Sequence, residues 1–310
     1  MSAYLYLLLG LVVLIISGNL LVSGSVQLAR RFKISTFVAG LTIVAYGTST
    51  PEIFIGIKAA LDGSFDIAIG NVIGSNIANI GCILAIVALV CPILVRNKAI
   101  GFDLVIMFFV TILLLIFGFN GIISRLEGTF LLLILISYTL WSVFKSKQKG
   151  VPKETEKATV KPLLATLMVI ASLVGMYFSS DWFVHGAKEI ALKWGVSERV
   201  IAISVVAIGT SMPELVTSMI AAFKKEADLA IGNIIGSNFF NIAGVLGITA
   251  IVRPLTVANH TLFVSDMMWL FGISIALVLT MIPLSKGKIR RWEGGLLLLV
   301  FAIYMVILFR

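Results

Sequence analysis

Two glutamates lie in apolar segments and could bind a cation there. The first segment reads VAYGTSTPE and ends at Glu52, and the second reads VAIGTSMPE and ends at Glu214. An ionisable side chain within a membrane is costly, so by default it marks a functional site. Each segment also offers carbonyl and hydroxyl oxygens next to its carboxylate. An all-oxygen environment of this kind suits hard cations such as Ca²⁺ and Na⁺.

Both acidic segments belong to a duplicated sequence. The register holds without a gap from about Ile34–Pro92 against Val196–Pro254, an offset of 162 positions. Further along, Arg125-Leu126-Glu127-Gly128 resembles Arg291-Trp292-Glu293-Gly294 at an offset of 166. Paired copies in corresponding hydrophobic segments indicate a transport site at a repeat interface.

Each glutamate directly follows a proline. Pro51 and Pro213 have no N–H, and their rings clash with the carbonyl one turn earlier, so they break a helix. The carbonyls that lose their donors lie near Gly47 and Gly209. Lipid offers no donor to such groups, so both breaks must face protein, water or an ion.

A second motif follows each acidic segment. The first copy reads AIGNVIGSNIAN and ends at Asn79, and the second reads AIGNIIGSNFFN and ends at Asn241. Ser75 and Asn79 are four residues apart and share a helix face, as do Ser237 and Asn241. The glycines let helices approach closely. Each acidic segment therefore has an oxygen-bearing helix to pack against.

Charge limits what the two glutamates could bind together. Two carboxylates neutralise one Ca²⁺, whereas without a cation they repel and one should take up a proton. Three Na⁺ ions in place of one Ca²⁺ would overshoot by one charge, which predicts electrogenic exchange. No His or Cys accompanies either acidic segment, which argues against zinc or copper.

The composition places the whole chain in a membrane. Of 310 residues, 59% are hydrophobic and 13% are charged, and the mean hydropathy is +1.09. A soluble globule has about 25% charged residues. The apolar runs are continuous and of spanning length, which predicts an all-α polytopic membrane protein and not a β-barrel. The net charge of +9 sits in short loops, so it does not indicate nucleic acid.

The apolar runs predict ten transmembrane helices. A Lys-rich polar stretch lies between the fifth and the sixth of them. The predicted domains are a first repeat, 1–145, a cytoplasmic linker, 146–160, and a second repeat, 161–310. The predicted spans are 3–28, 36–60, 66–91, 100–119, 127–145, 161–190, 199–222, 228–252, 260–283 and 291–309.

Five spans in each repeat have a geometric consequence. Because five is odd, the second copy must enter the membrane from the opposite side. Inverted repeats of this kind are the architecture of alternating-access transporters. With the N-terminus outside, most of the 24 Lys and Arg residues fall on the cytoplasmic side. We therefore expect a cell-membrane protein with both termini extracellular.

The paired motifs resemble those of a known family. Gly-Thr-Ser-X-Pro-Glu followed by Gly-Ser-Asn-X-X-Asn looks like the α-repeats of the cation/calcium exchanger superfamily, in its sodium/calcium exchanger branch and of the minimal prokaryotic type. The proton/calcium branch usually has Gly-Asn-X-X-Glu at the acidic position, which this chain lacks. The resemblance covers all ten predicted spans. It implies an antiporter that exchanges Na⁺ for Ca²⁺, with the first and sixth spans sliding past a rigid core of the other eight.

The resemblance also implies roles for individual residues. Calcium would be bound by Glu52, Glu214 and the backbone carbonyls of Thr48 and Thr210. Asn79 and Asn241 would lie at the middle of the site; some microbial relatives have Asp at the position of Asn241. The flanking sodium sites would use both glutamates, the hydroxyls of Ser49, Ser75, Ser211 and Ser237, and the carbonyls of Ala45 and Ala207.

Other functions remain open at the level of sequence. A proton- or potassium-coupled cation exchanger would share this fold. A cation channel would need a continuous pore and gives no reason for broken, inverted repeats. No nucleophile–base pair accompanies the repeats, so we expect a transporter and not an enzyme, without a cofactor or a protein partner. An isolated serine such as Ser75 usually only bonds back to its own helix; its recurrence favours a site.

Overall fold

The computed structural model describes residues 2–94, 100–149, 158–195, 207–281 and 288–308, and 87% of these described residues are helical. Within these ranges, eight helices are long and apolar enough to cross a membrane, and one bent pair makes a ninth candidate span. The chain is therefore a multi-pass helical membrane protein. The predicted span 199–222 begins outside the described residues, and its described part includes a shorter apolar helix, Met212–Phe223.

The helices follow the predicted spans to within a few residues, except that α8 continues into the predicted linker. The first half contains α1 (Ala3–Phe32), α2 (Thr36–Ala39), η1 (Gly40–Val44), α3 (Ala45–Thr48), α4 (Thr50–Leu61), α5 (Phe65–Ala78), η2 (Asn79–Leu84), α6 (Ala85–Val90), α7 (Ile100–Phe119) and α8 (Arg125–Lys149). The second half contains α9 (Pro162–Lys193), α11 (Ala207–Thr210), α12 (Met212–Phe223), α13 (Ala227–Phe240), η4 (Asn241–Leu246), α14 (Gly247–Val252), α15 (His260–Met281) and α16 (Arg291–Leu308). The segments η1, η2 and η4 are π-helical.

The last helix of each half begins with a glutamate that accepts the backbone N–H three residues before it. In α8, Glu127 accepts the N–H of Ser124 at 2.7 Å, and Ser124 Oγ accepts the N–H of Glu127 at 3.3 Å, which makes a reciprocal cap. In α16, Glu293 accepts the N–H of Arg290 at 2.6 Å, and arginine has no hydroxyl to return the bond. The duplicated Arg-X-Glu-Gly sequence is thus a helix start.

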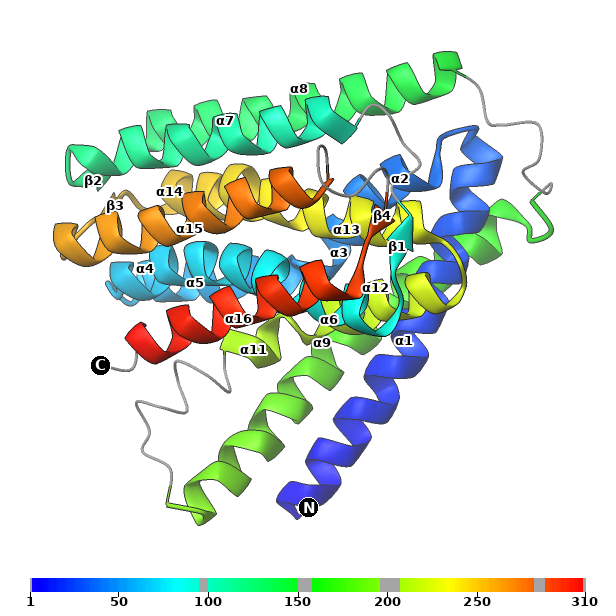
Figure 1. Cartoon of the computed structure of the whole chain (residues 1–310), viewed down its shortest axis with the longest axis horizontal. Helices are drawn as coiled ribbons and strands as arrows, with labels where there is room; N and C mark the ends of the chain where they lie inside the picture. The colour runs from blue at the N-terminus through cyan, green and yellow to red at the C-terminus, as the bar shows by residue number, and fades with distance from the viewer. Residues whose placement is uncertain (1, 95–99, 150–157, 196–206, 282–287, 309–310) are drawn as a thin grey trace.

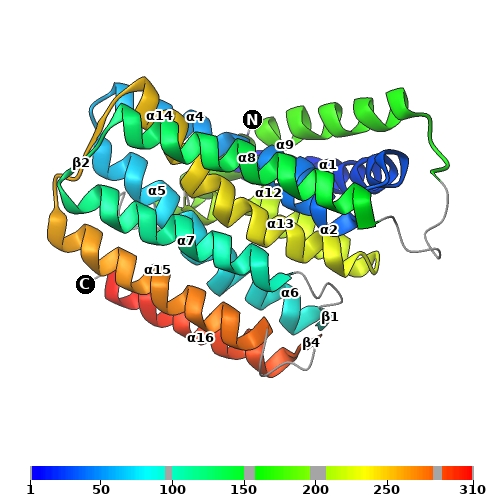
Figure 2. The same cartoon turned by 90° about the horizontal axis from the view of Figure 1, so that it is seen from above.

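Two short strand pairs join the halves. β1 (Ile93–Leu94) pairs antiparallel with β4 (Lys288–Ile289), and β2 (Ile122–Ile123) pairs antiparallel with β3 (Leu255–Thr256). β1 and β3 are equivalent at the offset of 162, and β2 and β4 at the offset of 166. Each pairing therefore repeats the other with the halves exchanged, residue for residue. The two pairs lie at opposite ends of the helix bundle (Figures 1 and 2).

Close helix packing repeats in the same exchanged way. A Cβ added at Gly128 of α8 would lie 2.7 Å from the carbonyl oxygen of Gly247 in α14. A Cβ added at Gly294 of α16 would lie 2.7 Å from the carbonyl oxygen of Ala85 in α6. Only glycine permits such approach. The last span of each half is thereby fixed against the third span of the other half.

The ends of α4 and α12 are also capped from the opposite half. The guanidinium of Arg253 donates to the carbonyl of Ala60 at 3.1 Å. At the equivalent place, the Cys91 thiol contacts the carbonyl of Ala222 at 3.7 Å. Cys82 and Cys91 are both free thiols.

The third span of each half forms the centre of the molecule. In the apolar stretch of α5–η2–α6, 78% of residues are buried, and in that of α13–η4–α14, 89%. In the other full-length spans the buried share is 28–39%. The outer helices α7, α8, α15 and α16 thus expose apolar side chains, as expected where lipid replaces water.

Helices α1 and α9 form a pair that runs obliquely to the bundle. They contain 30 and 32 residues, or about 45–48 Å at 1.5 Å per residue, which exceeds a hydrocarbon core of about 30 Å and favours tilt. Small residues bring their backbones together: a Cβ at Gly10 would lie 2.9 Å from the carbonyl of Ser179, and one at Gly186 would lie 2.6 Å from that of Ala3. Their ends at Ala3 and Lys193 project away from the other helices (Figure 1).

Candidate cation site

The duplicated motif adopts the same backbone twice. Ser49 lies between α3 and α4 with φ −86° and ψ 12°, and Ser211 lies between α11 and α12 with φ −88° and ψ 6°. These angles fall in the sparsely populated bridge region, where many active-site residues lie. The helix axis bends by 44° at the first break. Pro51 and Pro213 follow each break inside the first turn of the new helix, the position proline tolerates.

One of the two carbonyls that lose their helical donors bonds to a side chain inside the protein. The carbonyl of Gly209 accepts the hydroxyl of Ser180 from α9 at 3.0 Å. The position equivalent to Ser180 is Gly18, which has no hydroxyl. The two breaks therefore share a backbone but differ in their support.

The structure joins the two acidic segments. Both glutamates are buried, Glu52 with 0% and Glu214 with 1% exposure. Ser49, at the first break, donates its hydroxyl to Glu214 Oε1 in the second half at 2.9 Å. Within the described chain, Glu214 Oε2 and both carboxylate oxygens of Glu52 have no hydrogen-bond partner. Buried ionised oxygens of this kind require a compensating charge or proton.

The four predicted sodium-site hydroxyls divide into three groups. Ser49 donates to Glu214. Ser75 bonds back to the carbonyl of Asn71 at 2.6 Å, which is the ordinary role of a serine in a span. The hydroxyls of Ser211 and Ser237 are buried and have no hydrogen-bond partner among the described residues.

The predicted central amides occupy matching positions. Asn79 begins the π-helical segment η2 and Asn241 begins η4, and each is 1% exposed. In the described part of the chain, neither amide has a partner for its nitrogen or its oxygen. The segments cross between halves, since η2 packs against α12 and η4 against α4. The widened π turn often marks functional sites; nothing in the sequence signalled it.

The predicted carbonyl ligands lie in the last turns before the breaks. Thr48 and Thr210 each immediately precede a break. The carbonyl of Ala45 already accepts the N–H of Ser49 at 3.1 Å and the hydroxyl of Thr48 at 3.3 Å. Ala207 is the first residue of α11, directly after residues that the structure does not describe.

Three polar residues near the breaks had no predicted role. Asn233 on α13 accepts the hydroxyl of Thr48 at 3.3 Å and donates to the hydroxyl of Ser218 at 2.9 Å. Asn71, the equivalent of Asn233, donates to the backbone carbonyl of Glu52 at 3.5 Å. The signal that could have revealed these amides was present, because the Gly-Asn pair recurs in both copies.

The chemistry of this cluster suits a hard cation. Two carboxylates, amide oxygens and hydroxyls meet in a buried region, and many of these atoms lack a protein partner. Leaving a buried polar atom unsatisfied costs about 1–3 kcal/mol, so a concentration of them points to a bound species. No group of three or more His, Cys, Asp and Glu able to hold a metal occurs among the residues described. The cluster therefore fits Ca²⁺ and Na⁺, whose ligands include neutral oxygens.

Comparison with known proteins establishes the family. The family described as sodium/calcium exchanger protein matches residues 2–144 and 164–310, which include both acidic segments. This chain belongs to the sodium/calcium exchanger family. This family member is 32% identical to the sodium/calcium exchanger MaX1 of Methanosarcina acetivorans, over 99% of this chain and 98% of the relative. It is 34% identical to the inner membrane protein YrbG of Escherichia coli, over 80% and 79% of the two chains.

Solved structures agree with this assignment. This family member matches the sodium-calcium exchanger NCX_Mj soaked with Na⁺ and Ca²⁺ with a TM-score of 0.84 and 34% identity, over 99% of both chains. It matches the same exchanger soaked with Na⁺ and no Ca²⁺ with a TM-score of 0.85 and 34% identity, over 98% of both chains. The likeness extends over both halves.

Proposed function

We propose that this chain is a secondary antiporter that exchanges Na⁺ for Ca²⁺ across a membrane. The observation that carries the proposal is the joined pair of buried glutamates, with Ser49 of one break bonded to Glu214 of the other. The family assignment and the likeness to NCX_Mj, soaked with Na⁺ and Ca²⁺, support it. The mechanism we infer is alternating access, in which the same site opens to each side in turn.

In this proposal the site binds the two ions in competition. Calcium is bound by Glu52 and Glu214 with the carbonyls of Thr48 and Thr210. Asn79 and Asn241 lie between the glutamates and supply neutral oxygens. Sodium occupies flanking positions built from the same glutamates, from the hydroxyls of Ser49, Ser75, Ser211 and Ser237, and from the carbonyls of Ala45 and Ala207.

Charge balance makes the exchange electrogenic. Two carboxylates neutralise one Ca²⁺, so an occupied calcium site is neutral. If three Na⁺ replace it, the site carries one excess positive charge. Each cycle then moves one net positive charge opposite to calcium, and a membrane potential must act on the rate.

The exchanged contacts support inverted repeats over 1–145 and 161–310, joined by a cytoplasmic linker over 146–160. β1 with β4 repeats β2 with β3, yet the two pairs lie at opposite ends of the bundle. An axis that relates the halves must exchange these ends, so it lies across the helices and in the membrane plane. That is the relation expected of ten spans arranged as two inverted sets of five.

We further propose that α1 and α9 move as the sliding pair. They pack on each other along their length and leave the bundle at one end. We also propose that the protein lies in the cell membrane with both termini extracellular, an orientation supported by the excess of Lys and Arg in the loops predicted to be cytoplasmic.

Calcium uptake into proteoliposomes tests the proposal. Vesicles loaded with Na⁺ should take up Ca²⁺ when diluted into Na⁺-free medium, and vesicles loaded with K⁺ or given only a pH gradient should not. An inside-positive potential, clamped with a K⁺ ionophore, should accelerate the Na⁺-driven uptake. Uptake that follows the pH or K⁺ gradient and ignores Na⁺ would overturn the assignment. Na⁺-driven uptake that does not respond to voltage would overturn only the claim that exchange is electrogenic, and the exchange itself would stand.

A further inference from the structure

A buried amide connects the two halves of the candidate site without belonging to the proposed ligand set. Asn233 on α13 is completely buried. Its side-chain oxygen accepts the hydroxyl of Thr48 at 3.3 Å, a proton that the carbonyl of Ala45 shares at the same distance, and its nitrogen donates to Ser218 on α12 at 2.9 Å. Asn233 therefore links the residue before the first break to the helix that carries Glu214.

These contacts close a ring. Ser49, next to Thr48, donates directly to Glu214 at 2.9 Å. Glu214 and Ser218 are four residues apart on α12, so they lie on one helix face. Two consecutive residues at the first break are thus fixed to one face of α12, Ser49 directly and Thr48 through Asn233. Hydrogen bonds are stronger in a buried region of low dielectric than in water, so the ring restrains the first break relative to α12.

The equivalent ring cannot form between the second break and α4, the helix that carries Glu52. The residue equivalent to Ser218 is Gly56, which has no hydroxyl. The space beside Gly56 is filled instead by Thr249, whose hydroxyl would lie 2.8 Å from an added Cβ. The equivalent amide, Asn71, contacts the backbone carbonyl of Glu52 at the long distance of 3.5 Å. A duplicated asparagine therefore has two different roles.

We infer that Asn233 and Ser218 are positioning residues for calcium on the Thr48 side of the site, a role that Asn71 does not share. This inference rests on the proposed function, since Thr48 contributes its carbonyl to calcium there. Calcium needs six to eight oxygens at 2.3–2.6 Å, so a displaced carbonyl weakens it. Sodium does not depend on the Thr48 carbonyl in the proposed site.

The test compares Asn233→Ala, Ser218→Ala and the matched control Asn71→Ala. Loss of a buried hydrogen bond predicts an increase of about tenfold in the Ca²⁺ concentration for half-maximal exchange in the first two variants. We expect the Na⁺ concentration for half-maximal exchange to change by less than about twofold in all three. Asn71→Ala should keep the wild-type calcium dependence. Ser218→Ala removes only a hydroxyl and serves where Asn233→Ala does not fold.

Direct calcium binding to purified protein in detergent separates this inference from the proposed function. A wild-type protein that binds Ca²⁺ but shows no Na⁺-dependent uptake would refute the proposed exchange. In that case, the calcium affinities of the wild type and the variants would still test the positioning role. Equal weakening of calcium in Asn71→Ala and Asn233→Ala would overturn the inference. So would wild-type calcium affinity in a folded Asn233→Ala protein.

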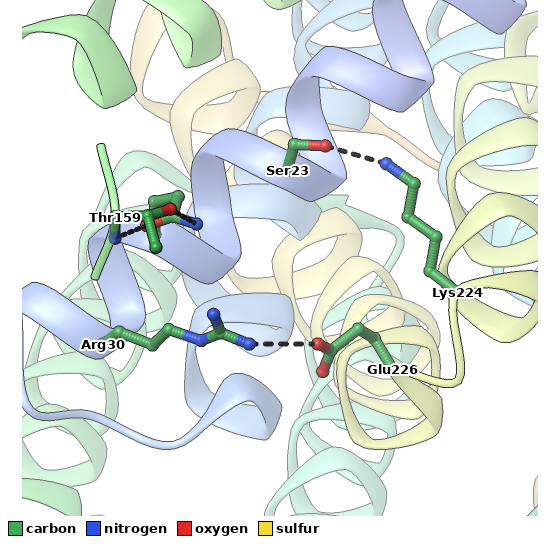
Figure 3. A network of polar contacts seen from close by, with 6 residues as sticks. Ser23, Arg30, Thr159, Lys224 and Glu226 are labelled. Carbon is green, nitrogen blue, oxygen red and sulfur yellow. Dashed lines mark hydrogen bonds and ion pairs between the residues drawn. The ribbon is translucent and has the colours of Figure 1, made fainter. Parts of the chain in front are cut away.

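A different observation concerns the end of α1. Figure 3 shows Lys224, which follows α12, reaching to Ser23 on α1, with Arg30 of α1 facing Glu226 nearby. Lys224 Nζ donates to Ser23 Oγ at 2.7 Å and also to the side-chain oxygen of Asn19. Arg30 and Glu226 form an ion pair at 3.9 Å. Partial burial lowers the pKa of the Lys224 amine, and the charge of Glu226 opposes this shift.

The equivalent residues at the other end have opposite chemistry. At the offset of 162, Lys224 corresponds to Asp62, Asn19 to Asp181, and Ser23 to His185. Two carboxylates thus stand at the positions equivalent to the lysine and the amide, and no hydrogen bond joins them in the described part of the chain. Among the described residues, His185 pairs with Glu189 of its own helix at 3.3 Å. The candidate site is duplicated, but this contact at its edge is not.

We propose that Lys224 is a one-sided latch that holds α1 to the turn between α12 and α13. The latch favours the arrangement seen here, in which α1 contacts that turn while its N-terminal end projects away from the other helices. Its pseudo-symmetric counterpart has no such stabilisation, so the two end states differ in free energy. This proposal does not depend on which cations are exchanged.

Spin labels at Phe32→Cys and Phe223→Cys, two exposed positions on α1 and α12, test the latch in a cysteine-free protein. Pulsed electron spin resonance should give one short distance in wild-type protein and an added longer one in Lys224→Gln. Lys225→Gln is the matched control, because the Lys225 side chain makes no hydrogen bond or ion pair with the described residues. An unchanged distance distribution in Lys224→Gln, or the same change in both variants, would overturn the latch.

Discussion

Glu52 and Glu214 hold equivalent sequence positions but have different surroundings. Glu214 accepts a hydrogen bond from Ser49, whereas both oxygens of Glu52 lack a partner in the described chain. The same difference appears in the serines, because Ser211 has no partner at the place where Ser49 has one. The site is therefore duplicated in sequence and asymmetric in structure. Both oxygens of Glu52 are therefore available to a bound ion, whereas one oxygen of Glu214 already accepts a hydrogen bond.

Each glutamate should be essential for exchange. Glu52→Gln and Glu214→Gln keep the side-chain shape but remove one of two charges that neutralise calcium. An uncompensated buried charge costs about 3–5 kcal/mol, so Na⁺-dependent Ca²⁺ uptake should fall by at least about 100-fold. Thermal melting without cations should be unchanged or higher, because like charges no longer repel. Proteoliposome uptake and melting in detergent measure both.

The exposed Glu189→Gln on α9 is the control for this pair, since its side chain is 41% exposed and lies outside the site. It should transport like wild type. Full activity of either Glu52→Gln or Glu214→Gln would contradict the central role of the carboxylates.

At the scale of single residues, the sequence indicated candidate ligands but not which of them form hydrogen bonds. Glu52, Glu214, Asn79 and Asn241 are all buried, and their binding roles stay a prediction. The bond from Ser49 to Glu214 was not predictable, because it joins the halves through tertiary contact. Repeats in a sequence indicate equivalent positions, and they do not indicate where equivalence fails.

At the scale of elements, α5 and α13 show the same contrast. Gly236 on α13 approaches the broken span of the first half, and an added Cβ would lie 2.4 Å from the carbonyl of Leu41. At its equivalent, Gly74 on α5, no described atom lies within 4 Å of an added Cβ. The same glycine is thus a packing requirement in one helix only.

Gly236→Ala should therefore destabilise the protein and Gly74→Ala should not. Overpacking against a backbone carbonyl costs about 1–3 kcal/mol. We expect a lower melting temperature and reduced uptake for Gly236→Ala, measured by thermal unfolding in detergent and by proteoliposome transport. Similar melting of the two variants would show that the close approach in α13 is relieved without cost.

Element boundaries were the most predictable part of the fold. Continuous apolar runs fixed the helices, and prolines marked the two broken spans. The π-helical segments η2 and η4 were not predicted, because one extra residue in a helical turn leaves the composition unchanged. The end of α8 at Lys149 also lies inside the predicted linker, since Lys and Gln are good helix formers.

At the scale of the whole molecule, the loop charges predict one orientation. In a protein whose native cysteines are replaced, Asn120→Cys should react with a membrane-impermeant maleimide in intact cells, and Lys147→Cys should not. Both positions are exposed, and they lie near opposite ends of α7 and α8. Mass-shift labelling before and after permeabilisation measures this. Labelling of Lys147→Cys alone in intact cells would reverse the orientation.

The contacts that join the halves were invisible in the sequence. Two-residue strands carry no periodic signal, so neither β1 with β4 nor β2 with β3 could be foreseen. The offsets of 162 and 166 show that β1 is equivalent to β3 and β2 to β4, but only after the strands have been located in the structure. Counting spans predicts a topology, whereas the way the two halves pack on each other could be described only from the structure.

The strand pairs have a consequence for how such a protein could arise. Each pair takes one strand from each half, and the two pairs are interchangeable under the exchange of halves. Two separate copies of a single half, inserted in opposite orientations, would therefore make both pairs as a self-complementary dimer. Joining the copies in one chain raises their effective concentration and adds the contacts of Thr159 and Val160 with Gln27 of α1. Cutting the chain between α8 and α9 should leave two fragments that still find each other in the membrane.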